Sequence, residues 1–216
     1  EQRYRAEIIS SRRIHLRTAD KNQHLSLDPA HYLLHADGDK QIACSRVREL
    51  QTGGLFLEPD SDLDLKRVYY LEIQPEGARL LCRMDGWMRQ TYSEKELGAF
   101  FVKQRDETVV RVFSPRAEQV RLYLYARRTG VAVEDQTHVM SRDENGVWET
   151  VLPGNFEGWW YDFTVHGAED PGNEFFEQVP VHVTDPYARV SDDSFGWARI
   201  WPRMQPPPPV RGGRPA

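Results

Sequence analysis

Hydrophobic and polar residues alternate along most of the chain in short runs, the period expected of β-strands whose successive side chains point to opposite faces. Glycine, proline and acidic residues separate the runs, as at Gly53-Gly54 and Glu76-Gly77. In the first half of the chain this pattern predicts strands at residues 5–10, 13–17, 31–35, 41–48, 67–73 and 78–83. In the second half it predicts strands at residues 108–114, 119–126, 137–141, 147–152 and 159–165.

The second half carries the sharper pattern. Within residues 120–125, aliphatic side chains alternate with Arg121, Tyr123 and Tyr125, which predicts one core face and one wetter face. Turn sequences such as Asn145-Gly146 separate the predicted strands, an order typical of an antiparallel β-sandwich of about 100 residues. No stretch predicts a long amphipathic helix; residues 92–98 could form one or two turns at most.

Composition narrows the class of protein. The chain has 216 residues, of which 39% are hydrophobic and 28% charged, and no apolar run approaches the ~20 residues of a membrane span. A formal net charge of −5 disfavours binding to a phosphate backbone. We therefore expect a soluble globular protein with neither a membrane nor a nucleic acid as partner.

Cysteine content and the N-terminus add two expectations. Cys44 and Cys82 are too few for a disulfide scaffold or a four-cysteine zinc site, so we expect buried free thiols, with a single bridge as the alternative. The chain opens at Glu1 without a methionine or an apolar leader. We expect a mature or excised piece of a longer protein, and the sequence leaves cytoplasmic and secreted locations both open.

One acidic segment has part of the pattern of a calcium-binding loop. Asp60, Asp62 and Asp64 have the spacing that opens such a loop. However, Leu65 stands at the position that needs glycine, and Leu71 stands where a bidentate glutamate is required. The segment is therefore interpreted as a solvated acidic loop.

Other chemical motifs are equally incomplete. His31 and His35 lie four residues apart, but Tyr32 occupies the place of the general-base glutamate of zinc proteases. On a strand, both histidines would lie on one partly exposed face. The sequence has no G-x-S-x-G elbow and no phosphate-binding glycine loop. We expect no catalytic residue, no metal site and no cofactor in this chain.

Aromatic residues are the remaining unusual feature, with six of them between Trp148 and Phe163. Tryptophan rings can stack on the apolar faces of sugars. Adjacent Trp159 and Trp160 on one strand would point to opposite faces, so at most one of them belongs to the core. The other is a candidate for carbohydrate contact, and packing in the core or against another domain is the alternative.

A series of motifs then occurs in order from Leu97 onward. They are L-G-A at residues 97–99, T-V-V-R-V-F-S-P-R-A at 108–117, V-R-L-Y-L-Y at 120–125, G-V-W at 146–148, G-W-W-Y-D-F at 158–163 and D-P-Y-A at 185–188. This order resembles carbohydrate-binding module family 48, with Phe113 in place of the family's tryptophan, one aromatic core residue for another. The resemblance implies that Trp148 and Tyr161 are core residues.

In that family the module follows a small β domain and precedes the catalytic barrel of α-1,6-debranching enzymes of glycoside hydrolase family 13, such as type I pullulanases. The resemblance therefore implies an all-β chain with two consecutive antiparallel β-sandwich (immunoglobulin-like) domains. Residues 1–90 would form the small N-terminal domain, residues 91–190 the module, and residues 191–216 a connector with a Pro-rich C-terminal tail.

The implied function follows from what the chain lacks. No barrel motif occurs in residues 1–216, so we expect this chain by itself to be inactive. The resemblance implies a non-catalytic N-terminal portion of a pullulanase-like hydrolase that supports its catalytic barrel. A sugar contact to pullulan, starch or glycogen through Trp159 or Trp160 is a further expectation. A free-standing α-glucan-binding or adaptor module is the alternative.

Overall fold

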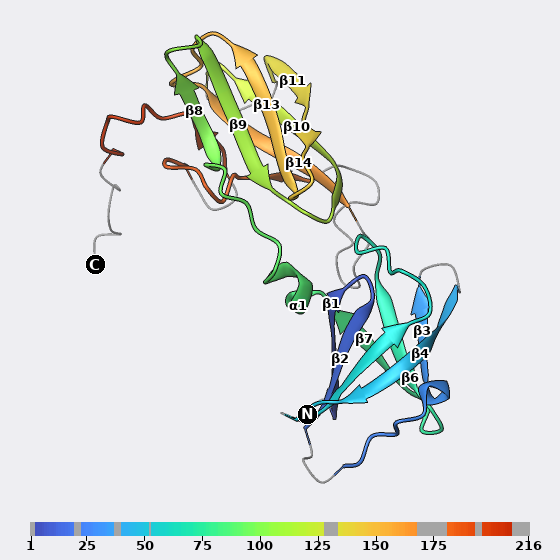
Figure 1. Cartoon of the computed structure of the whole chain (residues 1–216). Helices are drawn as coiled ribbons and strands as arrows, with labels where there is room; N and C mark the ends of the chain where they lie inside the picture. The colour runs from blue at the N-terminus through green and yellow to red at the C-terminus, as the bar shows by residue number, and fades with distance from the viewer. Residues whose placement is uncertain are drawn as a thin grey trace, which may run out of the picture. The chain divides into compact units, whose positions relative to one another are not determined.

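The computed structural model describes residues 3–19, 23–36, 40–51, 53–127, 134–167, 181–192 and 196–208, and it divides into two compact units (Figure 1). The first unit contains the described residues up to Tyr92, and the second contains those from Ser93 onward. Strands make up nearly all the regular structure of the described residues, which confirms the prediction of an all-β chain.

The first unit is a closed β-barrel with strand order β1-β2-β5-β4-β3-β6-β7. Its strands are β1 Tyr4–Ser10, β2 Arg13–Thr18, β3 Tyr32–Ala36, β4 Gln41–Glu49, β5 Leu55–Pro59, β6 Tyr69–Ile73 and β7 Ala78–Arg83. A 3-10 turn, η1 Pro29–His31, precedes β3. Parallel pairing of β1 with β7 closes the barrel. The sandwich expected for residues 1–90 is corrected to a barrel: alternation predicts which face is buried but not which strands pair.

Strand β4 takes part in both halves of the barrel. Near its start Ala43 pairs with Leu33 of β3, and further along Val47 pairs with Leu57 of β5. The register with β5 shifts between Cys44 and Arg46. Such a bulge bends a strand and increases its twist, which suits a strand at the corner of a barrel.

The barrel core contains both cysteines. Cys44 and Cys82 are buried and free, as predicted. Burial raises the pKa of the Cys44 thiol to about 12, and it raises the pKa of the Cys82 thiol further. Both side chains therefore stay protonated and act as small apolar core residues.

A short helix, α1 Asp85–Met88, packs on β1. It lies before residues 92–98, where a turn or two of helix was considered. Gly86 permits the approach, because a β-carbon there would lie 2.9 Å from the carbonyl oxygen of Ile8.

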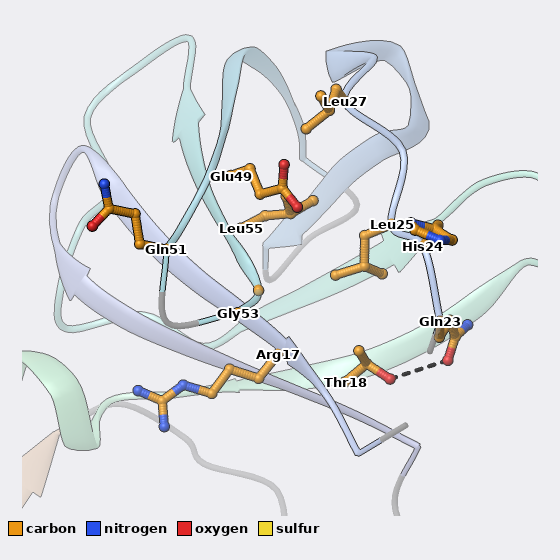
Figure 2. A pocket seen from close by; sticks show the side chains of 11 residues that line it. Arg17, Thr18, Gln23, His24, Leu25, Leu27, Glu49, Gln51, Gly53 and Leu55 are labelled. Atoms are coloured by element: carbon orange, nitrogen blue, oxygen red, sulfur yellow. Dashed lines mark hydrogen bonds between the residues drawn. The ribbon is translucent and has the colours of Figure 1, made fainter. Parts of the chain in front are cut away.

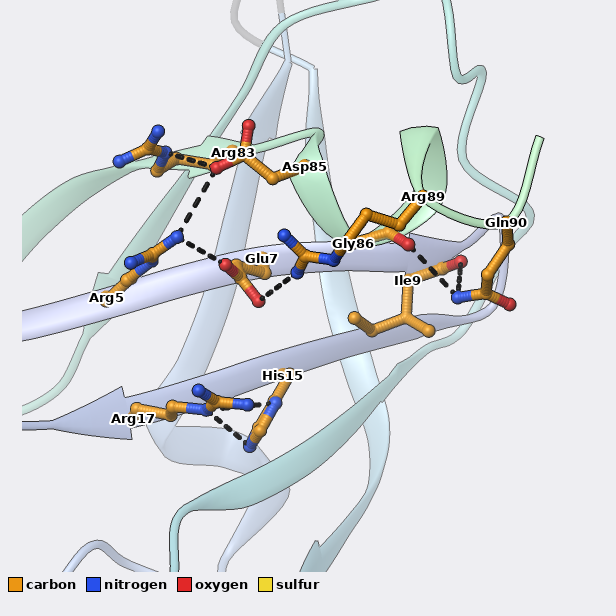
Figure 3. A network of polar contacts seen from close by, with 10 residues as sticks. All are labelled: Arg5, Glu7, Ile9, His15, Arg17, Arg83, Asp85, Gly86, Arg89 and Gln90. Carbon is orange, nitrogen blue, oxygen red and sulfur yellow. Dashed lines mark hydrogen bonds and ion pairs between the residues drawn. The ribbon is translucent and has the colours of Figure 1, made fainter. Parts of the chain in front are cut away.

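Beside this helix, the buried carboxylate of Glu7 accepts hydrogen bonds from Arg5 at 2.6 Å and from Arg89 at 3.3 Å (Figure 3). These ion pairs compensate the cost of burying the carboxylate.

The second unit contains two antiparallel sheets around one core. Its strands are β8 Gly98–Val102, β9 Glu107–Phe113, β10 Ala117–Tyr125, β11 Gln136–Val139, β12 Ser141–Arg142, β13 Val147–Pro153, β14 Trp160–Gly167, β15 His182–Val183 and β16 Ala198–Arg199. One sheet has the order β12-β13-β9-β8, and the other has β11-β10-β14-β15 with β16 also on β14. Val120, Leu122 and Leu124 are fully buried between them, as the alternation predicted, and Trp148 and Tyr161 are also core residues.

The second unit extends beyond residue 190, where a connector was expected to begin. Ala198 and Ile200 are fully buried in the second core, and β16 pairs with β14. The alternation of small and large side chains in residues 197–201 is therefore a strand pattern. Of the predicted Pro-rich tail, residues 209–216 lie outside the described residues.

The turn at Asn145-Gly146 brings Gly146 against Pro115. Gly146 has φ +84°, and a β-carbon there would lie 2.6 Å from the α-carbon of Pro115. Gly154 has a similar φ of +91°, but no atom lies within 4 Å of its corresponding position. Gly146 is thus required both by its backbone conformation and by close packing.

We expect Gly146→Ala to lower the free energy of unfolding by about 1–3 kcal/mol more than Gly154→Ala. Both variants incur the left-handed backbone penalty of about 1–2 kcal/mol, but only the first adds a clash. Urea unfolding followed by tryptophan fluorescence measures the difference. Equal losses in the two variants would contradict the packing argument.

Candidate carbohydrate-contact surface

The sheet face of β10 and β14 that lies opposite the core carries aromatic and polar side chains. Strand β10 contributes Tyr123 and Tyr125 to it. Strand β14 contributes Trp160, Asp162 and Thr164. The register places Tyr125 opposite Trp160 and Tyr123 opposite Asp162. We call these five residues, with Trp197, Arg199 and Trp201 beside them, the aromatic face.

Trp160 and Trp201 both lie beside one arginine. The guanidinium carbon of Arg199 lies 5.4 Å from the ring centroid of Trp160 and 5.3 Å from that of Trp201. Arg199 is paired with Trp160 across β16 and β14, and its Nε donates to the carbonyl oxygen of Gly158 at 3.1 Å. All three side chains are half-buried. Cation–π attraction therefore holds two indoles and a charge together at the surface.

The two tryptophans singled out in the sequence lie in different surroundings. Trp159 precedes β14 and packs against the second core. Its ring meets the Phe156 ring edge to face, with the ring centroids 4.9 Å apart. Trp160 lies on the aromatic face. The geometry therefore favours Trp160 over Trp159 as a ligand-contact residue.

Part of the aromatic face is covered by the chain itself. The Trp197 ring stacks on Tyr125 with centroids 4.5 Å apart and an angle of 17° between the planes. Tyr125 is 1% exposed as a result, although the alternation assigned it to the wetter face. The part of this face accessible to a ligand thus centres on Trp160, Arg199 and Trp201.

A buried carboxylate anchors the polar part of the face. Asp162 accepts from the Tyr125 hydroxyl at 3.1 Å and bonds His182 Nδ1 at 3.0 Å. Burial raises the pKa of Asp162, against the opposing hydrogen bonds from His182, Tyr125 and Trp197. The ring centroids of His182 and Tyr123 lie 4.5 Å apart, and the His182 side chain is 43% exposed. The carboxylate thus orients an imidazole that a ligand hydroxyl could reach.

The residues of the D-P-Y-A motif have a structural role. Asp185 is buried and accepts from the Tyr161 hydroxyl at 2.6 Å and from the Tyr187 backbone N–H at 2.8 Å. The Tyr187 carbonyl oxygen in turn lies 3.0 Å from where a β-carbon of Gly98 would stand. The start, the middle and the end of the motif series therefore lie next to one another around the buried Asp185.

Sequence reasoning missed Arg199 and Trp201. They lie in the region that the sequence predicted to be a connector. Trp197, Arg199 and Trp201 alternate with the buried Ala198 and Ile200. That two-residue period is the signal that could have identified them.

The structure separates the residues considered for metal binding. His31 Nδ1 bonds the Ser26 hydroxyl at 2.6 Å, whereas His35 Nε2 lies 2.7 Å from a carboxylate oxygen of Glu72. Both histidines are half-buried, as expected for alternate positions of that segment. Across the described ranges, no three His, Cys, Asp or Glu side chains are grouped to hold a metal. No helix among the described residues is long and apolar enough to cross a membrane.

Fold and surface together define the second unit as a two-sheet β module with an aromatic outer face. Residues 96–188 match the family model of carbohydrate-binding module 48, described as the isoamylase N-terminal domain. The second unit is therefore a module 48-like domain, as the motif series predicted. No curated protein sequence matches the chain.

Solved pullulanases share the fold of the chain. The apo pullulanase of Klebsiella pneumoniae aligns with 91% of this chain at a TM-score of 0.66 and 17% identity, over 23% of its own length. The Group B Streptococcus pullulanase SAP aligns with 90% of this chain at a TM-score of 0.61 and 18% identity, over 26% of the length of the pullulanase. The pullulanase of Bacillus acidopullulyticus aligns with 91% of this chain at a TM-score of 0.60 and 12% identity, over 36% of the length of the pullulanase. The chain thus spans about a quarter to a third of these proteins.

We expect Tyr161→Phe to lower the free energy of unfolding by about 1–3 kcal/mol, because it leaves the buried Asp185 without its hydroxyl donor. Tyr123→Phe is the matched control, since the Tyr123 hydroxyl is half-buried and lies 3.4 Å from the Thr164 hydroxyl. Urea unfolding of the two variants gives the comparison. A Tyr161→Phe loss no larger than that of Tyr123→Phe would contradict the role given to this bond.

The stability contributed by Asp185 should depend on pH. Burial raises the pKa of Asp185 despite the hydrogen bonds from Tyr161 and Tyr187. A carboxyl with a raised folded-state pKa binds its proton more tightly in the folded state. Its contribution is complete below the unfolded pKa and is lost as pH rises through the folded pKa. We expect the stability of the wild type relative to Asp185→Asn to be largest below pH ~4, the ordinary carboxyl pKa, and to fall as pH rises above it.

Asp143→Asn provides a control of opposite sign. Burial alone would raise the pKa of Asp143, but the hydrogen bond from Lys95, which lies 2.9 Å away, and the backbone N–H of Val147 outweigh it and lower the pKa. Its contribution is present above the unfolded pKa and is lost as pH falls through the folded pKa. Urea titrations from pH ~2 to pH ~7 should therefore show the Asp185 contribution falling as pH rises above ~4, and the Asp143 contribution falling as pH drops below ~4. Contributions that change in the same direction would refute the assignment for Asp185.

Proposed function

We propose that this chain is the non-catalytic N-terminal portion of a pullulanase-like α-1,6-glucan debranching hydrolase. Its second unit would contact α-glucan, and the chain as a whole would support a catalytic barrel elsewhere in the parent protein. The observation that carries the proposal is the match of residues 96–188 to carbohydrate-binding module 48, in a unit whose aromatic face exposes part of Trp160.

The aromatic face has the chemistry that a neutral sugar requires. Indole rings of Trp160 and Trp201 offer apolar surface to the C–H faces of glucosyl rings. Arg199 donates hydrogen bonds only, so it would pair with hydroxyl oxygens. The half-exposed His182, oriented by Asp162, offers a further polar group. Trp159 would serve in packing, where it supports the start of β14.

The wider comparison supports a role within a longer enzyme. The chain aligns with 90% of its length to the streptococcal pullulanase, which has also been solved in complex with maltotetraose. It covers only 26% of that protein. We propose that residues 1–90 and 91–190 correspond to its consecutive β domains, and that the residues after the buried Ile200 lead to the barrel.

Trp160→Ala should weaken binding of maltotetraose to the chain about tenfold, equivalent to about 1.4 kcal/mol. The reason is the loss of the indole surface on which the sugar would stack. Titration followed by intrinsic fluorescence and by calorimetry measures the affinity. Tyr92→Ala is the control, since Tyr92 is a 71% exposed aromatic residue outside the aromatic face.

Trp159→Ala separates contact from packing. It should lower the stability of the second unit and leave the sugar affinity of the folded protein nearly unchanged. Two results would overturn the contact role: unaltered maltotetraose affinity in Trp160→Ala, or no binding by the wild type up to roughly millimolar sugar. Only the structural role would then remain. Strong binding by the wild type would favour the free-standing glucan-binding alternative.

A further inference from the structure

Outward-facing arginines gather on three adjacent barrel strands of the first unit and on the segment that carries α1. The order β7-β1-β2 places these strands side by side. Cys82, Ala6 and Leu16 of these strands lie in the barrel core, so the residues next to them point outward. The arginines are Arg5 of β1, Arg17 of β2, Arg83 of β7 and Arg89 after α1 (Figure 3). We call these four residues the arginine cluster.

Two members of the arginine cluster are placed where a sheet normally avoids like charges. In the register of β1 with β2, Arg5 lies directly opposite Arg17. Like charges in this arrangement repel each other and destabilise the sheet. An anion bound between the two guanidinium groups would replace this repulsion with attraction.

Two carboxylates hold the arginine cluster in place without neutralising it. The buried Glu7 pairs with Arg5 and Arg89. Asp85 pairs with Arg5 at 3.4 Å and with Arg83 at 2.8 Å. Four positive charges against two negative charges leave a local excess of two, in a chain whose formal net charge is −5. This part of the barrel is therefore positive on a negative chain.

Arg17 contributes a charge that no described carboxylate compensates. Its Nε donates to the His15 ring at 3.2 Å, and among the described residues it forms no ion pair. Burial and the charge of Arg17 lower the pKa of His15, against the opposing effect of Glu7, so this imidazole is neutral at neutral pH. Arg17 also borders a cavity at one edge of the barrel. Figure 2 shows its side chain extending away from Glu49, which lines the same cavity.

Each guanidinium group of the arginine cluster keeps hydrogen-bond donors for a ligand. Across the described ranges, the polar contacts of each member use one nitrogen atom, which is Nη2 in Arg5 and Arg89 and Nε in Arg17 and Arg83. A guanidinium group carries five N–H donors in a planar fork. The side chains of Arg5 and Arg83 are 48% and 52% exposed. The fold therefore fixes each fork through one nitrogen and leaves other donors accessible.

The chemistry of the arginine cluster indicates an anion with several oxygen atoms. Guanidinium groups bind phosphate through pairs of parallel hydrogen bonds, which are stronger than hydrogen bonds between neutral groups. The oxygens of a phosphate group are arranged tetrahedrally, so it can accept from more than one arginine. A long phosphate backbone is disfavoured by the net negative charge of the chain. The arginine cluster therefore fits a single phosphate group.

We propose that the arginine cluster binds a phosphate group between Arg5, Arg17 and Arg83, either as free phosphate or as the end of a small phosphate ester. Glu7 and Asp85 would orient the guanidinium groups from the protein side. This proposal does not depend on the proposed function, because it involves neither the aromatic face nor a saccharide.

Titration of the 216-residue chain tests the proposal, with the arginine Nε–H signals followed by NMR. Inorganic phosphate is one probe and adenosine monophosphate is the other. Sodium chloride at equal ionic strength is the reference, because salt screens exposed charges. We expect saturable shifts of the Arg5, Arg17 and Arg83 signals. Tighter binding of inorganic phosphate would identify free phosphate as the ligand, and tighter binding of adenosine monophosphate would identify a phosphate ester.

Arg17→Gln is the sharpest variant, because Arg17 is exposed and its loss leaves no carboxylate unpaired. It should weaken phosphate binding about tenfold, as expected for the loss of a charged hydrogen-bond donor. Arg67→Gln is the matched control, since it removes the same charge from another arginine of the first unit whose side chain is 56% exposed. The control should bind phosphate as the wild type does.

Three results would overturn the proposal. The first is the absence of saturable shifts up to roughly ten millimolar phosphate. The second is a set of shifts that sodium chloride reproduces. The third is equal weakening of phosphate binding in Arg17→Gln and Arg67→Gln, which would show a general effect of charge.

Discussion

The hydrogen bond from the buried Tyr161 hydroxyl to Asp185 is the interaction on which the second unit depends. A buried carboxylate is tolerated only where donors compensate its lost hydration, and Tyr161 and the Tyr187 N–H are those donors. This point fixes the path of the chain as it leaves β15. The same chain then returns to pair β16 with β14 and sets Arg199 beside Trp160. The candidate contact surface is thus a consequence of a buried polar bond.

The sheet of β10 and β14 shows how one alternating pattern provides both a core face and an outward aromatic face. One face of this sheet contains fully buried aliphatic and aromatic side chains of the core. The opposite face carries the residues of the aromatic face. Three residues of that opposite face, Tyr125, Asp162 and Thr164, are nevertheless buried. Trp197 covers the Tyr125 ring, and hydrogen bonds hold the Asp162 carboxylate. Burial raises the pKa of Asp162, against the hydrogen bonds that it accepts. Burial of this centre confines ligand access to the half-buried indoles at its side.

The first unit reaches a closed core by another route. Its strands would read equally well as a sandwich, since either architecture buries every second residue. Closure depends on the parallel pairing of β1 with β7 and on the bulge in β4 near Cys44. Outside the barrel, the buried Glu7 and its two arginines hold the segment that carries α1. At one edge of the barrel, the ends of β2 and β4 and the start of β5 line a cavity.

The sequence by itself determined the strand content, the core faces, the buried free thiols and the module 48 resemblance, because each depends on local alternation or on motif order. It also singled out Trp159 and Trp160 as a pair of which at most one belongs to the core, since adjacent tryptophans on a strand must diverge, but it did not say which. Only the tertiary structure decided that residues 1–90 form a barrel, that Arg199 and Trp201 join Trp160, and that Asp185 pairs with Tyr161. Those features require contacts between residues far apart in the chain, and a two-residue period carries no information about which distant strand becomes a neighbour.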